Sequence, residues 1–188
     1  MKSHSPIEIR LFADDGGTPN HPLLPLVILR GTEAVGSQDA AVWFEQRFVT
    51  HGWLAIWRWT VYPYHHYHST NHEVLGVSRG TARLIFGGEN GGEFQVSTGD
   101  VIIIPAGVGH MRLDSSDDFQ VVGAYPRGEE PDLIRSGDDE SDAARLRVAE
   151  VTLPDQDPVF GENGPLIALW KQAIQPNTTT SANPPHAP

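Results

Sequence analysis

The chain has 188 residues, which is enough for one domain with a substantial buried core. Its formal net charge of −11 argues against binding to nucleic acid or to an anionic membrane surface, because both need clustered lysine and arginine. It contains no cysteine, so disulfides and thiolate metal sites are excluded, and any metal ion must be held by nitrogen and oxygen ligands.

The first fifty residues predict a lead-in strand or arm followed by one helix. IEIRLF at 7–12 alternates in polarity, and the apolar run LLPLVILRG at 23–31 follows a turn cluster. From 37 to 51 the apolar residues recur at helical spacing, with a cap at Ser37 or Asp39 and an end at Gly52. This part has no run that resembles a signal peptide, and the apolar runs of the chain are too short to cross a bilayer, so we expect a cytoplasmic location.

Residues 53–126 predict a core of closely spaced strands, because short runs of β-branched and aromatic residues recur there between turn signals. GGENGGE at 87–93 predicts a hairpin loop, and STGD at 97–100 predicts a tight turn into a buried strand. The predicted strands are LAIWRWTVY, EVLGVSRG, TARLIFGG, GGEFQVSTGD, VIIIPAG, HMRLD and FQVVGAY.

Beyond residue 126 the sequence predicts a loop-rich C-terminal extension with one short strand, LRVAEVTL at 146–153. Residues 176–188 are rich in proline, threonine and asparagine and have no apolar periodicity, which predicts a disordered tail. The expected organisation is therefore a single domain over 1–175.

A cluster of histidines carries the chemistry, since four of the nine fall within the eight residues 65–72. Alternate side chains of a strand share a face, so His66 and His68 point the same way, with backbones roughly 6.6 Å apart. Glu73 follows a four-residue turn, and an antiparallel return brings its carboxylate back to the same point. Two imidazoles and a carboxylate suit Fe, Mn, Ni, Cu or Zn, so this spacing predicts one divalent transition-metal ion of undetermined identity.

Two spacings make the chain resemble the cupin superfamily across about residues 53–125. The first is His66-x-His68, four residues, Glu73, six residues and Gly80, and the second is Gly99, five residues, Pro105-x-Gly107, two residues and His110. The chain departs from the common motifs in having Thr60 in place of glycine and Asp114 in place of asparagine. YPYHHYHST and VVGAYP further resemble small single-domain bacterial cupins of poorly characterised function.

The resemblance implies an all-β fold, an antiparallel jelly-roll barrel of six to eight strands. It also implies a metal ion inside the barrel that is held by three histidines and one glutamate, with His110 as the fourth ligand. The alternative is a barrel filled by hydrogen-bonded polar groups without an ion, which would leave several buried polar groups to be desolvated. We expect His65 and His72 to lie on the surface or behind the ligands.

Other polar side chains are candidates for contact with a substrate. Tyr62 and Tyr64 share the parity of His66, and their alternative role is core packing. Arg112 lies two residues beyond His110 and could grip a substrate carboxylate, or could instead form a salt bridge with an acidic rim. We therefore take Arg112 and Tyr64 as catalytic candidates. The tryptophans Trp57 and Trp59 are assigned to barrel packing.

Three functions are compatible with these residues. The first is a metal-dependent dioxygenase acting on a small organic molecule, the second uses the ion as a Lewis acid for isomerisation, decarboxylation or hydrolysis, and the third is a barrel that binds a small ligand without catalysis. The apolar segment 23–31 and exposed sheets favour a homodimer.

Overall fold

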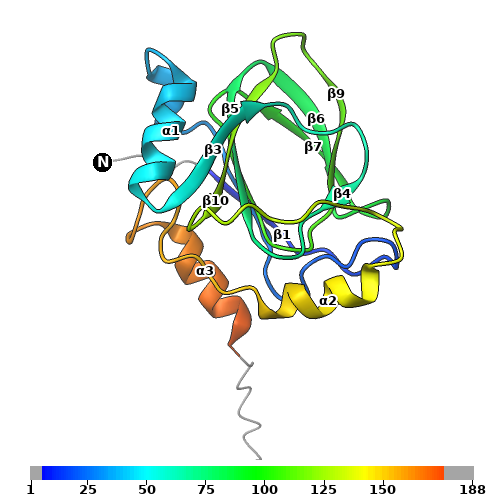
Figure 1. The fold of residues 1–188 in the computed structure, drawn as a ribbon. Coiled ribbons are helices and arrows are strands. Elements are labelled where there is room, and N and C mark those ends of the chain that lie inside the picture. Colours follow the sequence, from blue (N-terminus) through cyan, green and yellow to red (C-terminus); the bar gives the residue numbers. More distant parts are fainter. Residues whose placement is uncertain (1–5, 176–188) are drawn as a thin grey trace, which may run out of the picture.

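The computed structural model describes residues 6–175, in which two antiparallel sheets face each other and helices lie outside them (Figure 1). The six-stranded sheet has the order β1 (Ile7–Arg10), β2 (Leu26–Leu29), β8 (Val101–Ile104), β5 (Glu73–Arg79), β10 (Gln120–Pro126) and β3 (Trp53–Trp59). The five-stranded sheet has the order β11 (Ile134–Arg135), β4 (His66–Tyr67), β9 (His110–Ser115), β6 (Thr81–Phe86) and β7 (Gly92–Ser97). This arrangement is consistent with a cupin jelly roll, but strand pairing within the described residues leaves two separate sheets and not a closed barrel.

The strands expected between residues 53 and 126 are all present. β6 and β7 form a hairpin around the predicted loop, with Thr81 opposite Ser97 and Phe86 opposite Gly92. The turn after β7 is closed by a hydrogen bond from Asp100 N to Ser97 O (3.0 Å). Gly99 in this turn has a φ of 96°, a conformation that favours glycine. Turn residues thus placed these strand boundaries correctly.

Strands β2 and β8 of the six-stranded sheet are buried on both faces, which explains why they are continuously apolar. In β2, Val27 and Leu29 face the helices, whereas Leu26 and Ile28 face the other sheet. β8 divides its side chains in the same way. Runs such as LVIL and VIII therefore belong to strands with two dry faces.

Helix α1 (Ala40–Thr50) lies within the predicted range 37–51, after a short 3-10 turn at Glu33–Gly36. The side chain of Asp39 accepts hydrogen bonds from two backbone amides of the first turn, as expected for a helix cap. Phe44 and Phe48 pack on the outer face of the six-stranded sheet. A Cβ at residue 76 would lie 2.6 Å from the Phe44 ring, so glycine in β5 allows the helix to approach closely.

The C-terminal extension differs from the expectation, because it contains two helices, α2 (Ser141–Glu150) and α3 (Pro165–Ile174). The predicted strand at 146–153 is wrong. Ala144 and Val148 are buried at helical spacing in α2, and the short apolar alternation of LRVAEVTL concealed this. α3 lies on the same side of the molecule as α1, below it in Figure 1, and adds Trp170 to the apolar cluster that α1 packs against. The Trp170 indole donates to Pro25 O (3.0 Å). The predicted tail at 176–188 lies outside the described residues.

The N-terminal segments contribute two strands to the larger sheet. β1 pairs with β2, and β2 pairs with β8. The apolar side chains of residues 26–29 are buried in the core. They are not available to a second copy of the chain, and the expected homodimer would have to form through other surfaces. Within residues 6–175, no helix is long and apolar enough to cross a membrane.

Acid should destabilise the fold through His21, whose Nδ1 accepts hydrogen bonds from Leu23 N (3.1 Å) and Leu24 N (2.9 Å). Burial lowers the pKa of His21 to about 4. The unfolded chain, with a histidine pKa near 6.5, binds the proton more readily, so stability should fall as the pH drops from about 6.5 to 4, by up to about 3 kcal/mol.

The matched variant is His21→Asn, which keeps an acceptor for both amides and removes the titration. Urea unfolding curves at a series of pH values should show a smaller loss of stability in acid for His21→Asn than for the wild-type protein. Equal pH dependence of the two proteins would contradict this role of His21.

Candidate metal centre

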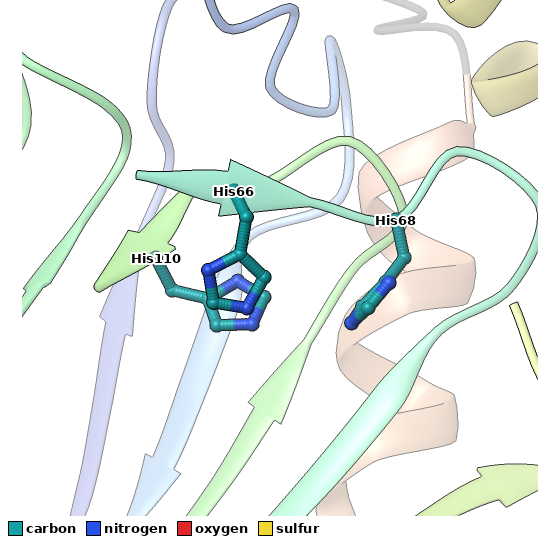
Figure 2. Close-up of side chains that lie close together, drawn as sticks. All are labelled: His66, His68 and His110. Atoms are coloured by element: carbon teal, nitrogen blue, oxygen red, sulfur yellow. The ribbon is translucent and has the colours of Figure 1, made fainter. Parts of the chain in front are cut away.

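Three histidine side chains converge at one end of the five-stranded sheet. His66 of β4 lies directly opposite His110 of β9, and their ring centroids are 4.1 Å apart. His68 follows β4, and its ring approaches the other two, with centroids 5.8 Å from His66 and 5.6 Å from His110 (Figure 2). One nitrogen from each ring lies within 4.8 Å of the others, so the three could hold one metal ion.

The hydrogen bonds of these rings leave the same nitrogen free in each. Nδ1 of His66 lies 3.0 Å from Tyr64 O, Nδ1 of His110 lies 3.1 Å from Val108 O, and Nδ1 of His68 lies 2.5 Å from Asp132 O. A carbonyl oxygen can only accept, so each Nδ1 carries the proton. In the neutral rings Nε2 therefore carries a free lone pair. These lone pairs face the space between the three rings, as metal binding requires.

Glu73 brings a carboxylate to the cluster from the other sheet. It is the first residue of β5, and its Oε2 lies 3.2 Å from Nε2 of His110 and 3.5 Å from Nε2 of His68. This oxygen is buried and has no hydrogen-bond partner within the described residues. A buried carboxylate oxygen without a hydrogen bond is costly by itself, and a divalent cation would pair with it and with the imidazole nitrogens. The donor set fits a transition-metal ion.

The electrostatics of the cluster favour a neutral His66 ring, an ionised Glu73 and a proton on His68 that a metal ion would displace. Burial and the neighbouring His110 lower the pKa of His66 to about 2, so this ring is neutral. Burial by itself would raise the pKa of Glu73, but the imidazoles of His68 and His110 outweigh it and lower that pKa, so the carboxylate is ionised. Burial by itself would lower the pKa of His68, whereas the Glu73 carboxylate raises it. A cation at this point would replace the His68 proton as the partner of Glu73.

A cavity of about 360 Å³ opens beside the cluster. It exposes His66, His68, Glu73 and His110 on one side and aromatic and aliphatic residues elsewhere. Trp57 and Tyr125 form part of its wall, and the Trp57 indole donates to the Tyr125 hydroxyl (3.0 Å). A Cβ at residue 123 would lie 2.0 Å from the Trp57 ring, so only glycine lets that ring lie across β10.

The remaining candidates from the sequence occupy different places. Tyr62 lines the cavity, whereas Tyr64 is absent from its lining and lies between the ring of Tyr62 (4.9 Å) and the guanidinium of Arg135 (4.1 Å). Arg112 does not line the cavity either. Its guanidinium donates to Ser115 Oγ (2.9 Å), further along β9. Strand parity gives the face on which Arg112 begins, but it does not give the direction of so long a side chain.

The two extra histidines also differ from each other. His65 is half-buried and lies outside the cavity lining. His72 is fully buried, so the surface position we considered for it is wrong. Its Nδ1 accepts a hydrogen bond from Ala106 N (2.9 Å), and its ring contacts Trp170 of α3 at 4.8 Å. His72 thus ties the loop before His110 to the helical layer.

The segment between β10 and β11 was not predicted to take part in the site. Glu130, Pro131 and Leu133 line the cavity, and the carbonyl of Asp132 accepts a hydrogen bond from Nδ1 of His68. The Asp132 carboxylate accepts from the backbone and hydroxyl of Ser69, which in turn contacts Arg147 of α2. Residues 127–133 have an acidic, loop-like composition, and nothing in that composition predicts that the segment folds back over the histidines.

Tyr125 was also missed as a cavity residue. Burial, together with the carboxylates of Glu73 and Glu130, raises the pKa of Tyr125, so its hydroxyl keeps its proton. Trp57 and Trp59, which we had assigned to packing, both line the cavity, and Trp59 is 53% exposed at its mouth.

Known proteins provide three comparisons. Residues 58–121 match the cupin domain family. The uncharacterized protein YjlB of Bacillus subtilis (strain 168) is 43% identical over 160 residues, which cover 85% of this chain and 93% of YjlB.

Two solved structures are similar at low identity. One is an acireductone dioxygenase from Bacillus anthracis with a cadmium ion in its active center (20% identity, TM-score 0.34, 47% of this chain and 59% of that chain). The other is an oxalate decarboxylase variant from Bacillus subtilis (19% identity, TM-score 0.36, 59% of this chain and 27% of that chain). The match spans less than two thirds of each of these structures.

Removal of one metal-binding side chain should prevent the site from holding a metal ion. His66→Ala and His110→Ala should each abolish stoichiometric metal binding, because each removes a nitrogen that no neighbouring group replaces. His65→Ala should retain the metal. Elemental analysis of the purified variants, after exposure to Zn²⁺ and removal of the excess, measures this. Equal metal loss in all three variants would contradict the assignment.

The Asp132 carboxylate, which holds its loop against Ser69, should affect metal affinity indirectly. Asp132→Ala should weaken metal binding by about tenfold, because the carbonyl that orients His68 is no longer held against Ser69. Asp138→Ala, in an exposed position beyond β11, is the matched control. Competition titrations against a chromogenic chelator give both affinities, and unchanged affinity in Asp132→Ala would contradict the prediction.

Proposed function

The chain belongs to the cupin superfamily, and on that premise we propose that it is a metal-dependent enzyme, a dioxygenase that acts on a small organic molecule. The observation that carries the proposal is the position of the three imidazoles and Glu73. They lie on one side of a cavity of about 360 Å³ whose other walls are largely aromatic and aliphatic. A ligand in this cavity would therefore lie beside the ion.

His66, His68, Glu73 and His110 would hold the ion, with the Nε2 atoms and the carboxylate as ligands. When bound, an ion such as Fe(II) supplies a centre at which substrate and O2 are brought together. The backbone carbonyls at Tyr64, Asp132 and Val108 keep the three rings in the metal-binding tautomer. Positioning is thus provided by the backbone of three different segments.

The cavity walls would contribute orientation and exclusion of water. Trp57 and Leu75 exclude water from the space next to the cluster. The Tyr125 hydroxyl accepts from Trp57 and keeps its own proton, which it would donate to an oxygen atom of a molecule in the cavity.

The choice of a dioxygenase rests on the groups that are available. Apart from the four proposed ligands, Glu130 is the one carboxylate in the described lining, and no lysine or further histidine accompanies it. Non-redox reactions such as hydrolysis or isomerisation depend on a positioned acid and base. Dioxygenation places both atoms of O2 in the product and consumes no external reductant, so it requires little beyond the ion and a dry cavity.

The test has two steps. Metal content is measured in protein purified without added metal, and oxygen consumption is then followed with iron-loaded protein over a panel of carboxylates, diketones and phenols. We expect iron-dependent oxygen uptake that is lost in His66→Ala. Turnover without oxygen uptake would instead favour Lewis-acid catalysis, and ligand binding without turnover under any metal would favour a non-catalytic binding protein.

A further inference from the structure

We propose that the cavity selects a neutral, ring-bearing molecule and rejects organic anions such as carboxylates of the same shape. The inference builds on the proposed function, because it concerns the substrate class of the same site. It rests on the charges and the surface that line the cavity, which are independent of the reaction.

The cavity lining has no basic side chain among the described residues. Arg112 and Arg135, on the strands beside the histidines, are engaged elsewhere, since Arg112 donates to Ser115 and Arg135 covers the ring of Tyr64. A carboxylate in such a cavity would lose its hydration without gaining a cationic partner from the protein.

Negative charge adds to this cost. Glu130 lies in the cavity lining, and Glu73 lies beside the histidines. A bound divalent ion would have one of its two charges neutralised by Glu73, so it could attract one anionic oxygen but would not offset a second anionic group near Glu130. The chain as a whole carries a net charge of −11, which also repels anions on approach.

The aromatic walls suit a flat apolar ligand. Trp59 contacts Tyr62 edge-to-face at 5.0 Å, and both line the cavity together with Trp57. Trp59 is 53% exposed and Leu133 is 48% exposed, so apolar surface continues to the mouth. A ring entering here would bury apolar area on both of its faces and could stack on these side chains.

The Tyr125 hydroxyl remains to orient such a molecule. It lies in the cavity lining, accepts from Trp57 and has its proton to donate. A neutral hydroxyl or carbonyl group of a ligand can bond to it, which gives direction without a charge.

The test compares two probes of nearly the same shape, 4-hydroxyphenylacetamide and 4-hydroxyphenylacetate, with 4-ethylphenol as a third, purely apolar phenol. Binding is measured by calorimetry with Zn²⁺-loaded and with metal-free protein, so that no turnover is needed. In the metal-free protein we expect the amide and 4-ethylphenol to bind at least about tenfold more tightly than the carboxylate, because there the carboxylate would lose its hydration without a cationic partner. The Zn²⁺-loaded protein shows how much of that difference one metal-bound oxygen offsets.

Variants identify the source of the selectivity. Glu130→Lys should remove or reverse the preference against the carboxylate, whereas Glu129→Lys, the exposed neighbouring position outside the lining, should leave it unchanged. Tyr125→Phe keeps the ring, removes the hydroxyl and should weaken binding of the amide and of 4-ethylphenol by about tenfold.

Tighter or equal binding of the carboxylate by the metal-free wild-type protein would overturn the proposal, as would equal effects of Glu130→Lys and Glu129→Lys, or no saturable binding of any probe. These outcomes are separate from those of the proposed function. A protein that binds the neutral probes selectively but consumes no oxygen would retain this inference and lose the dioxygenase.

Discussion

The direct pairing of His66 with His110 across β4 and β9 is the constraint on which the site depends. Antiparallel strands hold opposite residues at a fixed separation, so these two imidazoles remain adjacent whether or not an ion is present. Each ring is further fixed by a hydrogen bond from Nδ1 to a backbone carbonyl two residues earlier in the chain. His68 and Glu73 then complete the cluster from neighbouring segments, and Glu73 comes from the opposite sheet.

The helical layer contributes rigidity to that arrangement. Because α1 and α3 cover the outer face of the six-stranded sheet, β5 is dry on both sides, and the backbone that carries Glu73 is held by packing as well as by strand pairing. His72, the residue before Glu73, contacts Trp170 of α3 and receives a hydrogen bond from Ala106. The position of the carboxylate is therefore coupled to a helix that lies outside the sheets.

The segment after β10 connects the metal cluster to the cavity. Its Asp132 carbonyl orients His68, and its neighbours Glu130 and Leu133 form part of the cavity lining. One short loop thus affects both how a ligand nitrogen is directed and what charge a substrate meets at entry. Arg147 of α2 donates to the Ser69 hydroxyl, and Ser69 also bonds to Asp132. The C-terminal extension therefore helps to hold the loop that orients His68.

Local signals in the sequence were sufficient for much of this molecule. Turn residues and alternating apolar runs predicted the strands from Trp53 to Pro126, and the two cupin spacings led to His66, His68, Glu73 and His110 as one group. Both features depend on the alternation of side chains along a strand and on short turns. Residues close together in the sequence determine these.

Only the tertiary structure decided what surrounds that group. Arg112 has the parity of His110, but its guanidinium bonds to Ser115 instead of facing the cavity. Tyr125, Thr60 and Glu130 reach the cavity through contacts between segments far apart in the chain, and α2 and α3 formed where a loop-rich extension was expected. The physical reason is that strand period determines which face a side chain occupies, whereas the direction of a long side chain and the path of a loop depend on the partners that packing brings to them.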